Sequence, residues 1–95
     1  MLHLDWTEAA EADKDGIIDY IAQENIYAAI EVGDEIERQT EMLRTFPDVG
    51  RSGRIEETRE LVITGLPYII CYAADSETVT ILRVLHGRQQ WIVAT

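Results

Sequence analysis

The apolar residues of this chain change their spacing once, at a segment rich in proline, glycine and serine, residues 47–58. Before this segment they recur every three or four positions, which is the spacing of an amphipathic helix. After it they alternate with polar residues or form short apolar runs between turn residues, as β-strands do. A change of period of this kind predicts an α+β fold, in which the helices precede most of the strands.

Two helices are expected before residue 47. The first begins after Thr7, whose hydroxyl can cap it, and runs to about Gln23. The second falls within residues 24–46 and ends before Pro47. Because only a few residues near Asn25 join the two helices, we expect them to pack as an antiparallel pair. Their inward faces are predicted to hold Ala10, Ile17, Ile18, Ile21, Ala29, Val32, Ile36 and Leu43.

Four strands are expected around this helical pair. Residues 2–6 alternate apolar and polar side chains, and three further runs follow the loop at 59–64, 68–74 and 78–85. The short turns between the last three runs predict an antiparallel meander, with the middle run at its centre. The expected order is strand, helix, helix, strand, strand, strand, in a single domain over residues 1–95. The helical pair would cover one face of a four-stranded sheet.

The last predicted strand carries an arginine in an unusual position. Simple alternation puts Arg83 on one face with Val79, Ile81 and Leu85, and His86 on the other face. An arginine on an apolar face is costly unless it meets a carboxylate or lies at an open rim. Arg83, together with Arg59, could therefore form an anion-binding or partner-binding patch. Alternatively, each arginine could pair with one of the many acids in a structural salt bridge.

Charge is distributed unevenly along the chain. The whole sequence has 18 acids and 8 bases, for a formal net charge of −10. Residues 1–44 hold twelve acids and three bases, whereas residues 45–95 hold six acids and five bases, all arginine. So acidic a protein is poorly suited to bind nucleic acid, since affinity for phosphate depends largely on lysine and arginine. The five arginines of the second part could nevertheless converge: Arg51, Arg54, Arg59, Arg83 and Arg88.

Several classes of site are not indicated by the sequence. It contains no phosphate-binding loop, dinucleotide fingerprint or nucleophile elbow, and its two histidines and one cysteine lack metal-ligand spacing, so no cofactor or metal is expected. Cys71 lies in an apolar run and has no disulfide partner, which fits a reducing compartment. No apolar run is long enough to span a bilayer. We therefore expect a cytoplasmic protein without a membrane partner. His86, two residues before Arg88, could act as a general acid or base or as a hydrogen-bonded structural residue.

Six stretches of the sequence, in order, resemble one family. They are W-T-x-x-A-x-x-D at 6–13, DYIA at 19–22, FPDVGRSGR at 46–54, TRELVI at 58–63, PYIICY at 67–72 and ILRVLHGRQQW at 81–91. Together they are similar to the RelE/ParE superfamily of toxins from bacterial type II toxin-antitoxin systems. The resemblance implies two helices packed on an antiparallel sheet. It also implies a cognate, ParD-like antitoxin that forms a hetero-oligomer with the toxin.

The superfamily contains at least two activities. RelE-type members cleave mRNA in the ribosome, whereas ParE-type members are described as inhibitors of DNA gyrase. This sequence is more similar to the ParE, or plasmid-stabilisation, branch, and its net charge favours the same branch. We therefore expect a ParE-like toxin that inhibits gyrase by binding. The residues expected to contact the target or the antitoxin are Arg51, Arg54, Arg59, Leu61, Ile63, Arg83, His86, Arg88 and Trp91, although Trp91 could equally belong to the core.

Two alternatives remain open. A ribosome-dependent endoribonuclease would use Arg59, Arg83, His86 and Arg88 for cleavage. An inactivated toxin, retained as an antitoxin-binding module, is the other alternative. It is suggested by Lys14, which stands where the family usually has an apolar residue, and by Gly16, which costs the helix about 1 kcal/mol relative to alanine. Both changes lie in the first helix, which we expect to be packed less tightly than in relatives.

Overall fold

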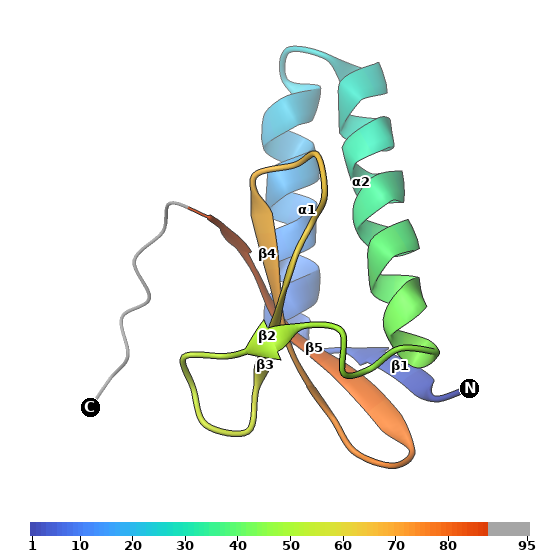
Figure 1. Cartoon of the computed structure of the whole chain (residues 1–95). Helices are drawn as coiled ribbons and strands as arrows, with labels where there is room; N and C mark the ends of the chain where they lie inside the picture. Colours follow the sequence, from blue (N-terminus) through green and yellow to red (C-terminus); the bar gives the residue numbers. More distant parts are fainter. Residues whose placement is uncertain (88–95) are drawn as a thin grey trace.

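The computed structural model describes residues 1–87, and their order of elements confirms the predicted α+β fold (Figure 1). A short 3-10 turn, Met42–Arg44, extends the second helix. The elements are β1 (His3–Trp6), α1 (Glu8–Ala22), α2 (Ile26–Glu41), β2 (Arg51–Ser52), β3 (Arg59–Val62), β4 (Tyr68–Ala74) and β5 (Thr78–His86).

The sheet has five strands, so the prediction of four was wrong. Its order is β1-β5-β4-β3-β2, in which β1 runs parallel to β5 and the other neighbours are antiparallel. The additional strand, β2, lies within the segment predicted to be a loop and pairs Arg51 with Glu60. A strand of two residues is too short to show alternation in a sequence, which is why the pattern did not reveal it.

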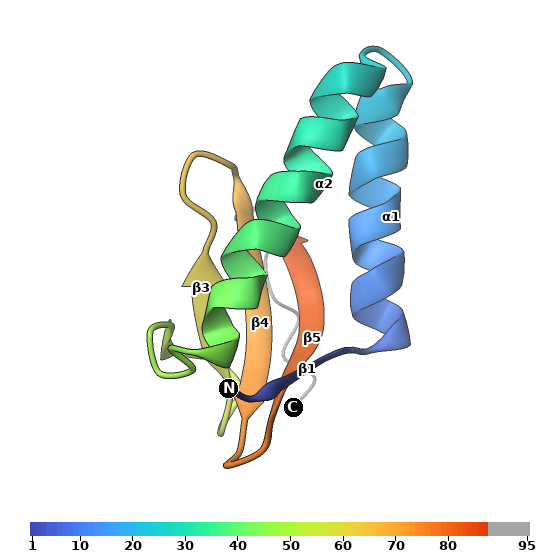
Figure 2. The same cartoon turned by 90° about the vertical axis from the view of Figure 1, so that its right-hand side faces the viewer.

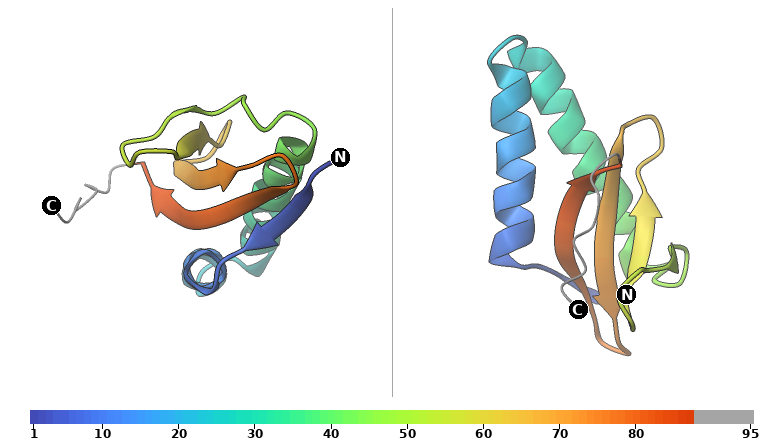
Figure 3. Two further views of the ribbon diagram at one scale, coloured as in Figure 1. Left: turned by 90° about the horizontal axis from the view of Figure 1, so that it is seen from below. Right: turned by 90° about the vertical axis from the view of Figure 1, so that its left-hand side faces the viewer.

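Both helices cover the same face of the sheet (Figures 1 and 2). Figure 3 shows the arrangement from below and from the side of the other face, which we call the outer face. Between the helices and the sheet lies the core, in which Tyr72 is the largest fully buried side chain. The other members of this core are Ala10, Ile36, Leu43, Ile63, Ile70, Val79, Ile81 and Val84.

Strand β5 contains a bulge that changes which side chains face the core. Ile81 pairs with Tyr72 and Arg83 pairs with Cys71, so Leu82 is an extra residue without a counterpart in β4. Simple alternation is therefore interrupted, and Val84 follows Ile81 on the core face. The prediction that Arg83 shares a face with Ile81 was wrong for this reason. Arg83 lies on the outer face, opposite Cys71.

The free edge of β5 beyond β1 is closed by side chains of α1 and the residue before it. The backbone N–H of Thr7 donates to the carbonyl oxygen of Ile81 over 3.0 Å, and its hydroxyl donates to that of Leu82 over 2.9 Å. The same hydroxyl accepts the backbone N–H of Ala10 and so caps α1, as predicted. Thr7 therefore fixes the start of the helix to the bulge.

Asp13 continues this closure one turn further along α1. Its carboxylate accepts the backbone N–H of Val84 at 2.9 Å and two N–H groups of Arg83 at 2.7 and 3.1 Å. The hydrogen bond and the charge of Asp13 raise the pKa of the Arg83 guanidinium above its ordinary value. A side chain thus occupies the edge position that a further residue of β1 would otherwise take.

Lys14, the unusual residue of α1, is accommodated between the helices. Its side chain is 11% exposed, and its ammonium lies 4.5 Å from the centre of the Trp6 ring and 3.2 Å from the carboxylate of Glu37 on α2. The aliphatic stem can be buried while the charge reaches an acid, so this position does not separate α1 from α2.

Replacing Asp13 should separate its two roles. Asp13→Ala leaves the N–H of Val84 without its acceptor, and we expect a loss of about 1–3 kcal/mol in the free energy of unfolding. Asp13→Asn retains an acceptor and mainly removes the ion pair with the half-exposed Arg83, so its loss should be only about 0.5–1 kcal/mol. Urea denaturation of both variants measures the difference. Equal losses would mean that the backbone hydrogen bond contributes little.

Candidate partner-binding site

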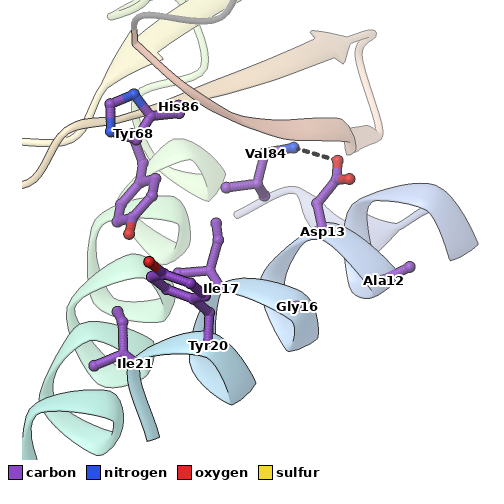
Figure 4. A pocket seen from close by; sticks show the side chains of 9 residues that line it. All are labelled: Ala12, Asp13, Gly16, Ile17, Tyr20, Ile21, Tyr68, Val84 and His86. Carbon is purple, nitrogen blue, oxygen red and sulfur yellow. Dashed lines mark hydrogen bonds between the residues drawn. The ribbon is translucent and has the colours of Figure 1, made fainter. Parts of the chain in front are cut away.

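A groove lies between the flank of α1 and the ends of β4 and β5 (Figure 4). Its volume is ≈ 600 Å³. Ile17, Tyr20 and Ile21 line it from the helix, and Tyr68 and His86 line it from the strands. The walls are therefore largely apolar and aromatic, with a few polar atoms, a composition that is usual for a ligand-binding cleft.

One end of the groove is shaped by the pair Tyr68 and His86. They are direct cross-strand neighbours, and their rings meet edge to face with centroids 5.8 Å apart. Partial burial raises the pKa of the Tyr68 hydroxyl, so this group remains a protonated hydrogen-bond donor at neutral pH. The backbone N–H of Gly87 donates to the carbonyl of Pro67 over 2.7 Å and fixes the strand end beside them.

Gly16 lines the groove and leaves free space above the surface of α1. A Cβ atom built on this glycine would meet no atom within 4 Å. The position can therefore accept a Cβ atom without displacing a neighbour, and because Gly16 lines the groove, a side chain there would border it. The helix cost expected from Gly16 thus coincides with an open stretch of the surface of α1.

The arginines do not converge on this groove. Arg51, Glu60, Cys71 and Arg83 occupy successive positions in one row across β2, β3, β4 and β5, on the outer face of the sheet. Glu60 is 2% exposed, and its carboxylate accepts N–H groups of the Arg51 side chain at 3.0 and 3.3 Å and the backbone N–H of Arg54 at 3.2 Å. The guanidinium groups of Arg51 and Arg54 thus surround one buried acid and remain about half exposed.

Arg59 and Arg83 each have an acidic partner, as the salt-bridge alternative predicted, but each also has a further contact or exposed surface. Arg83 pairs with Asp13, while Arg59 donates to the carbonyl oxygens of Asp48 and Gly50 and lies 3.7 Å from the carboxylate of Asp48. Arg59 shares the face of its cross-strand neighbour Tyr72 and holds the loop that precedes β2.

Tyr72, from the core, also holds the loop that precedes β2. Its hydroxyl donates to the carbonyl of Pro47 over 2.7 Å and accepts the N–H of Gly50 over 2.9 Å. Burial raises the pKa of this hydroxyl, and the hydrogen bond from Gly50 offsets part of that effect. The two interactions make Tyr72 a structural residue.

The other residues predicted to contact a partner are buried, partly buried or outside the described residues. Ile63 is 1% exposed and belongs to the core, and Leu61 is partly buried and packs against it, so neither offers an open apolar surface. Arg88 and Trp91 lie outside the described residues. Cys71 is buried, and burial is the largest cause that raises the pKa of its thiol.

The sequence-based interpretation missed the helical side of the groove. Tyr20 lies off the inward stripe of α1, on the same side as Gly16, and is exposed. The signal available in the sequence was an aromatic residue four positions after a glycine. Within residues 1–87, no group of three His, Cys, Asp or Glu side chains could hold a metal ion. In the same part of the chain, neither helix is long and apolar enough to cross a membrane.

Comparison with known proteins agrees with the fold. The model of the family described as ParE toxin of type II toxin-antitoxin system, parDE, matches residues 4–91. A protein of Sinorhizobium fredii (strain NBRC 101917 / NGR234) named "Putative toxin Y4kP" is 43% identical over 86 residues, which are 90% of this chain and 88% of that protein.

Two solved structures are also similar. A chain of the chromosomal ParDE TA system from P. aeruginosa superposes with a TM-score of 0.81 at 26% identity, over 90% of this chain and 96% of that chain. The solution structure of the conserved hypothetical protein HP0894 from Helicobacter pylori has a TM-score of 0.61 at 18% identity, over 96% of this chain and 100% of that one, and shares the fold. The match over residues 4–91, with the close toxin relative, shows that this chain belongs to the ParE toxin family of type II toxin-antitoxin systems.

Proposed function

We propose that this chain is a cytoplasmic toxin that binds and inhibits DNA gyrase, and that a cognate ParD-like antitoxin neutralises it. The family and the similar ParDE structure support the antitoxin partner. The sequence resemblance to the ParE branch supports gyrase as the target.

The observation that carries the choice of a binding toxin over a nuclease is the dispersal of Arg59, Arg83 and His86, which are the candidate catalytic groups among residues 1–87. Arg83 lies on the outer face of the sheet, whereas His86 lies on the groove side with Tyr68. Arg59 pairs with Tyr72, four residues along β4 from Tyr68, which corresponds to roughly 13 Å along a strand. General acid-base catalysis needs its groups within hydrogen-bond reach of one reacting centre, and this spread supports an inhibitor that acts by binding.

The outer face and the groove suit different partners. Arg51, Arg54 and Arg83 present half-exposed guanidinium groups on the outer face, and such groups favour carboxylate-bearing contacts of a target protein. The groove beside α1 is apolar and aromatic and fits the apolar face of an antitoxin helix or strand. The antitoxin and the target would therefore use two separate surfaces.

Filling the groove should prevent neutralisation without preventing toxicity. In Gly16→Trp the indole would project into the space beside Tyr20, and the change from glycine favours the helix. We expect growth arrest that co-expressed antitoxin no longer relieves. Asp15→Trp places the same side chain at the neighbouring exposed position, and antitoxin should neutralise this control as it does the wild type. Equal neutralisation of both variants would exclude the groove as the antitoxin site.

The nature of the target can be tested by expressing the chain alone. Pulse-labelled DNA synthesis should fall before protein synthesis, and the purified toxin should reduce supercoiling by gyrase while leaving RNA intact. A ribosome-dependent endoribonuclease would instead stop translation first and leave cut messages. Growth that continues normally would indicate an inactivated toxin retained as an antitoxin-binding module.

Two substitutions in β5 separate recognition from catalysis. Arg83→Ala should abolish toxicity, since loss of a charge-assisted contact in an interface costs about 2–5 kcal/mol when the pair is buried. His86→Gln should remain toxic, because a hydrogen-bonding side chain is retained. Removal of a general acid or base would instead cost roughly 100-fold to 10,000-fold in rate.

The readout is toxicity at matched soluble levels, with circular dichroism to confirm folding. Asp13→Asn is the control for Arg83→Ala, because it removes the ion pair but retains the arginine. A folded, harmless His86→Gln beside a lethal Arg83→Ala would favour the endoribonuclease.

A further inference from the structure

The first two turns of α2 carry an apolar patch that points into solvent. Ile26, Tyr27 and Ile30 are 60%, 78% and 54% exposed. Residues three and four positions apart are neighbours on a helix surface, so Ile30 adjoins both Ile26 and Tyr27. We call these three residues the hairpin patch. Contiguous exposed apolar surface of this kind often marks a binding site.

Tyr27, the most exposed residue of the hairpin patch, points away from the packed side of α2. The inward side of α2 is formed by Ala29, Gly33 and Ile36. Tyr27 is nine residues from Ile36, which corresponds to about 180° around the helix axis. The end of the hairpin where the patch lies also extends past the ends of the sheet strands (Figure 2). Packing within the described residues therefore leaves Tyr27 uncovered, and it leaves more than half of Ile26 and Ile30 exposed.

The charges around the patch have one sign. Residues 15–37 contain seven acids and no lysine or arginine. Glu31 lies one turn beyond Tyr27 and Asp34 one turn beyond Ile30, and both are exposed. A surface of this composition repels phosphates and a second copy of itself, and it attracts lysine and arginine.

We propose that the hairpin patch is a second docking surface for the toxin's target, and that it fits a protein surface on which lysine or arginine side chains surround an apolar pocket. This inference rests on the proposed function, because it assumes that the toxin acts by binding a target protein. The groove assigned to the antitoxin is lined from α1, β4 and β5, and no residue of α2 lines it. Target and antitoxin therefore meet different helices. Tyrosine is also enriched among the residues that dominate binding energy in interfaces.

The test compares the full-length wild type with three variants, using purified DNA gyrase and the purified antitoxin as probes. The patch variant is Tyr27→Ser with Ile30→Ser, and the charge variant is Glu31→Lys with Asp34→Lys. The control is Phe46→Ser with Val49→Ser, which removes similarly exposed apolar surface, 62% and 58%, far from the hairpin end. Circular dichroism and thermal unfolding establish that each variant is folded.

We expect the patch variant to bind gyrase at least about 10-fold more weakly than the wild type, with unchanged antitoxin affinity. The charge variant should associate with gyrase about 10-fold more slowly at about 50 mM NaCl, and the difference should shrink at about 500 mM NaCl. The control should match the wild type with both probes.

The other outcomes overturn the inference in distinguishable ways. If the wild type binds gyrase and the patch variant binds equally well, the patch has no role although the proposed function stands. If the patch variant loses the antitoxin, the surface belongs to that partner. If the wild type arrests growth without binding gyrase, the proposed target fails and toxicity becomes the readout. A patch variant that then still arrests growth refutes the inference, whereas loss of toxicity with antitoxin binding intact supports it. A wild type that neither binds gyrase nor arrests growth refutes both proposals.

Discussion

The extra residue Leu82 in β5 is the constraint on which the arrangement of this fold depends. The bulge turns the second half of β5 so that Val84 joins the core and Arg83 leaves it. It also presents the carbonyls of Ile81 and Leu82 to Thr7, whose side chain simultaneously begins α1. A bulge bends its strand and increases the local twist. The bend in β5 and the start of α1 therefore lie at the same point, where Thr7 contacts both. The start of α1 is therefore tied to a single irregularity in β5.

Asp13 connects the bulged strand β5 with the candidate binding groove. One carboxylate closes the edge of β5 and holds the Arg83 side chain on the outer face. The same residue borders the groove between α1 and the strands. A partner that enters the groove would therefore lie directly beside the ion pair of an arginine that faces the opposite side. The two faces of the sheet are connected here through one side chain of the helix.

The sequence predicted the elements that depend on local periodicity and turn residues. Thr7, the short link near Asn25 and the turns before Tyr68 and Thr78 located both helices and the meander correctly. The patterns did not reveal the bulge, because Leu82 is apolar and continues an apolar run, so nothing in the strand itself shows that one residue lacks a partner. Its position is decided by β4 and by Thr7, which is 75 residues away in the sequence.

The candidate site was less predictable than the fold for the same reason. Arg59 and Arg83 read as a pair in the sequence, but each is held by groups that alternation cannot locate, a loop carbonyl for Arg59 and an acid of α1 for Arg83. The groove depends on how far α1 stands from β4 and β5, which is a result of packing. Tyr20 and Gly16 line a groove only because α1 stands at that separation from the strands.

The buried Glu60 has a consequence for how this surface could diversify among related proteins. One interior carboxylate balances Arg51 and lies close to Arg54, although both arginines reach the solvent. A mutation to glutamine would leave the external side chains unchanged, but it would add one positive charge to the outer face. A substitution at this buried position could thus change which partners the surface prefers, although no partner would touch the substituted residue. A comparison of surface residues alone would overlook such a change.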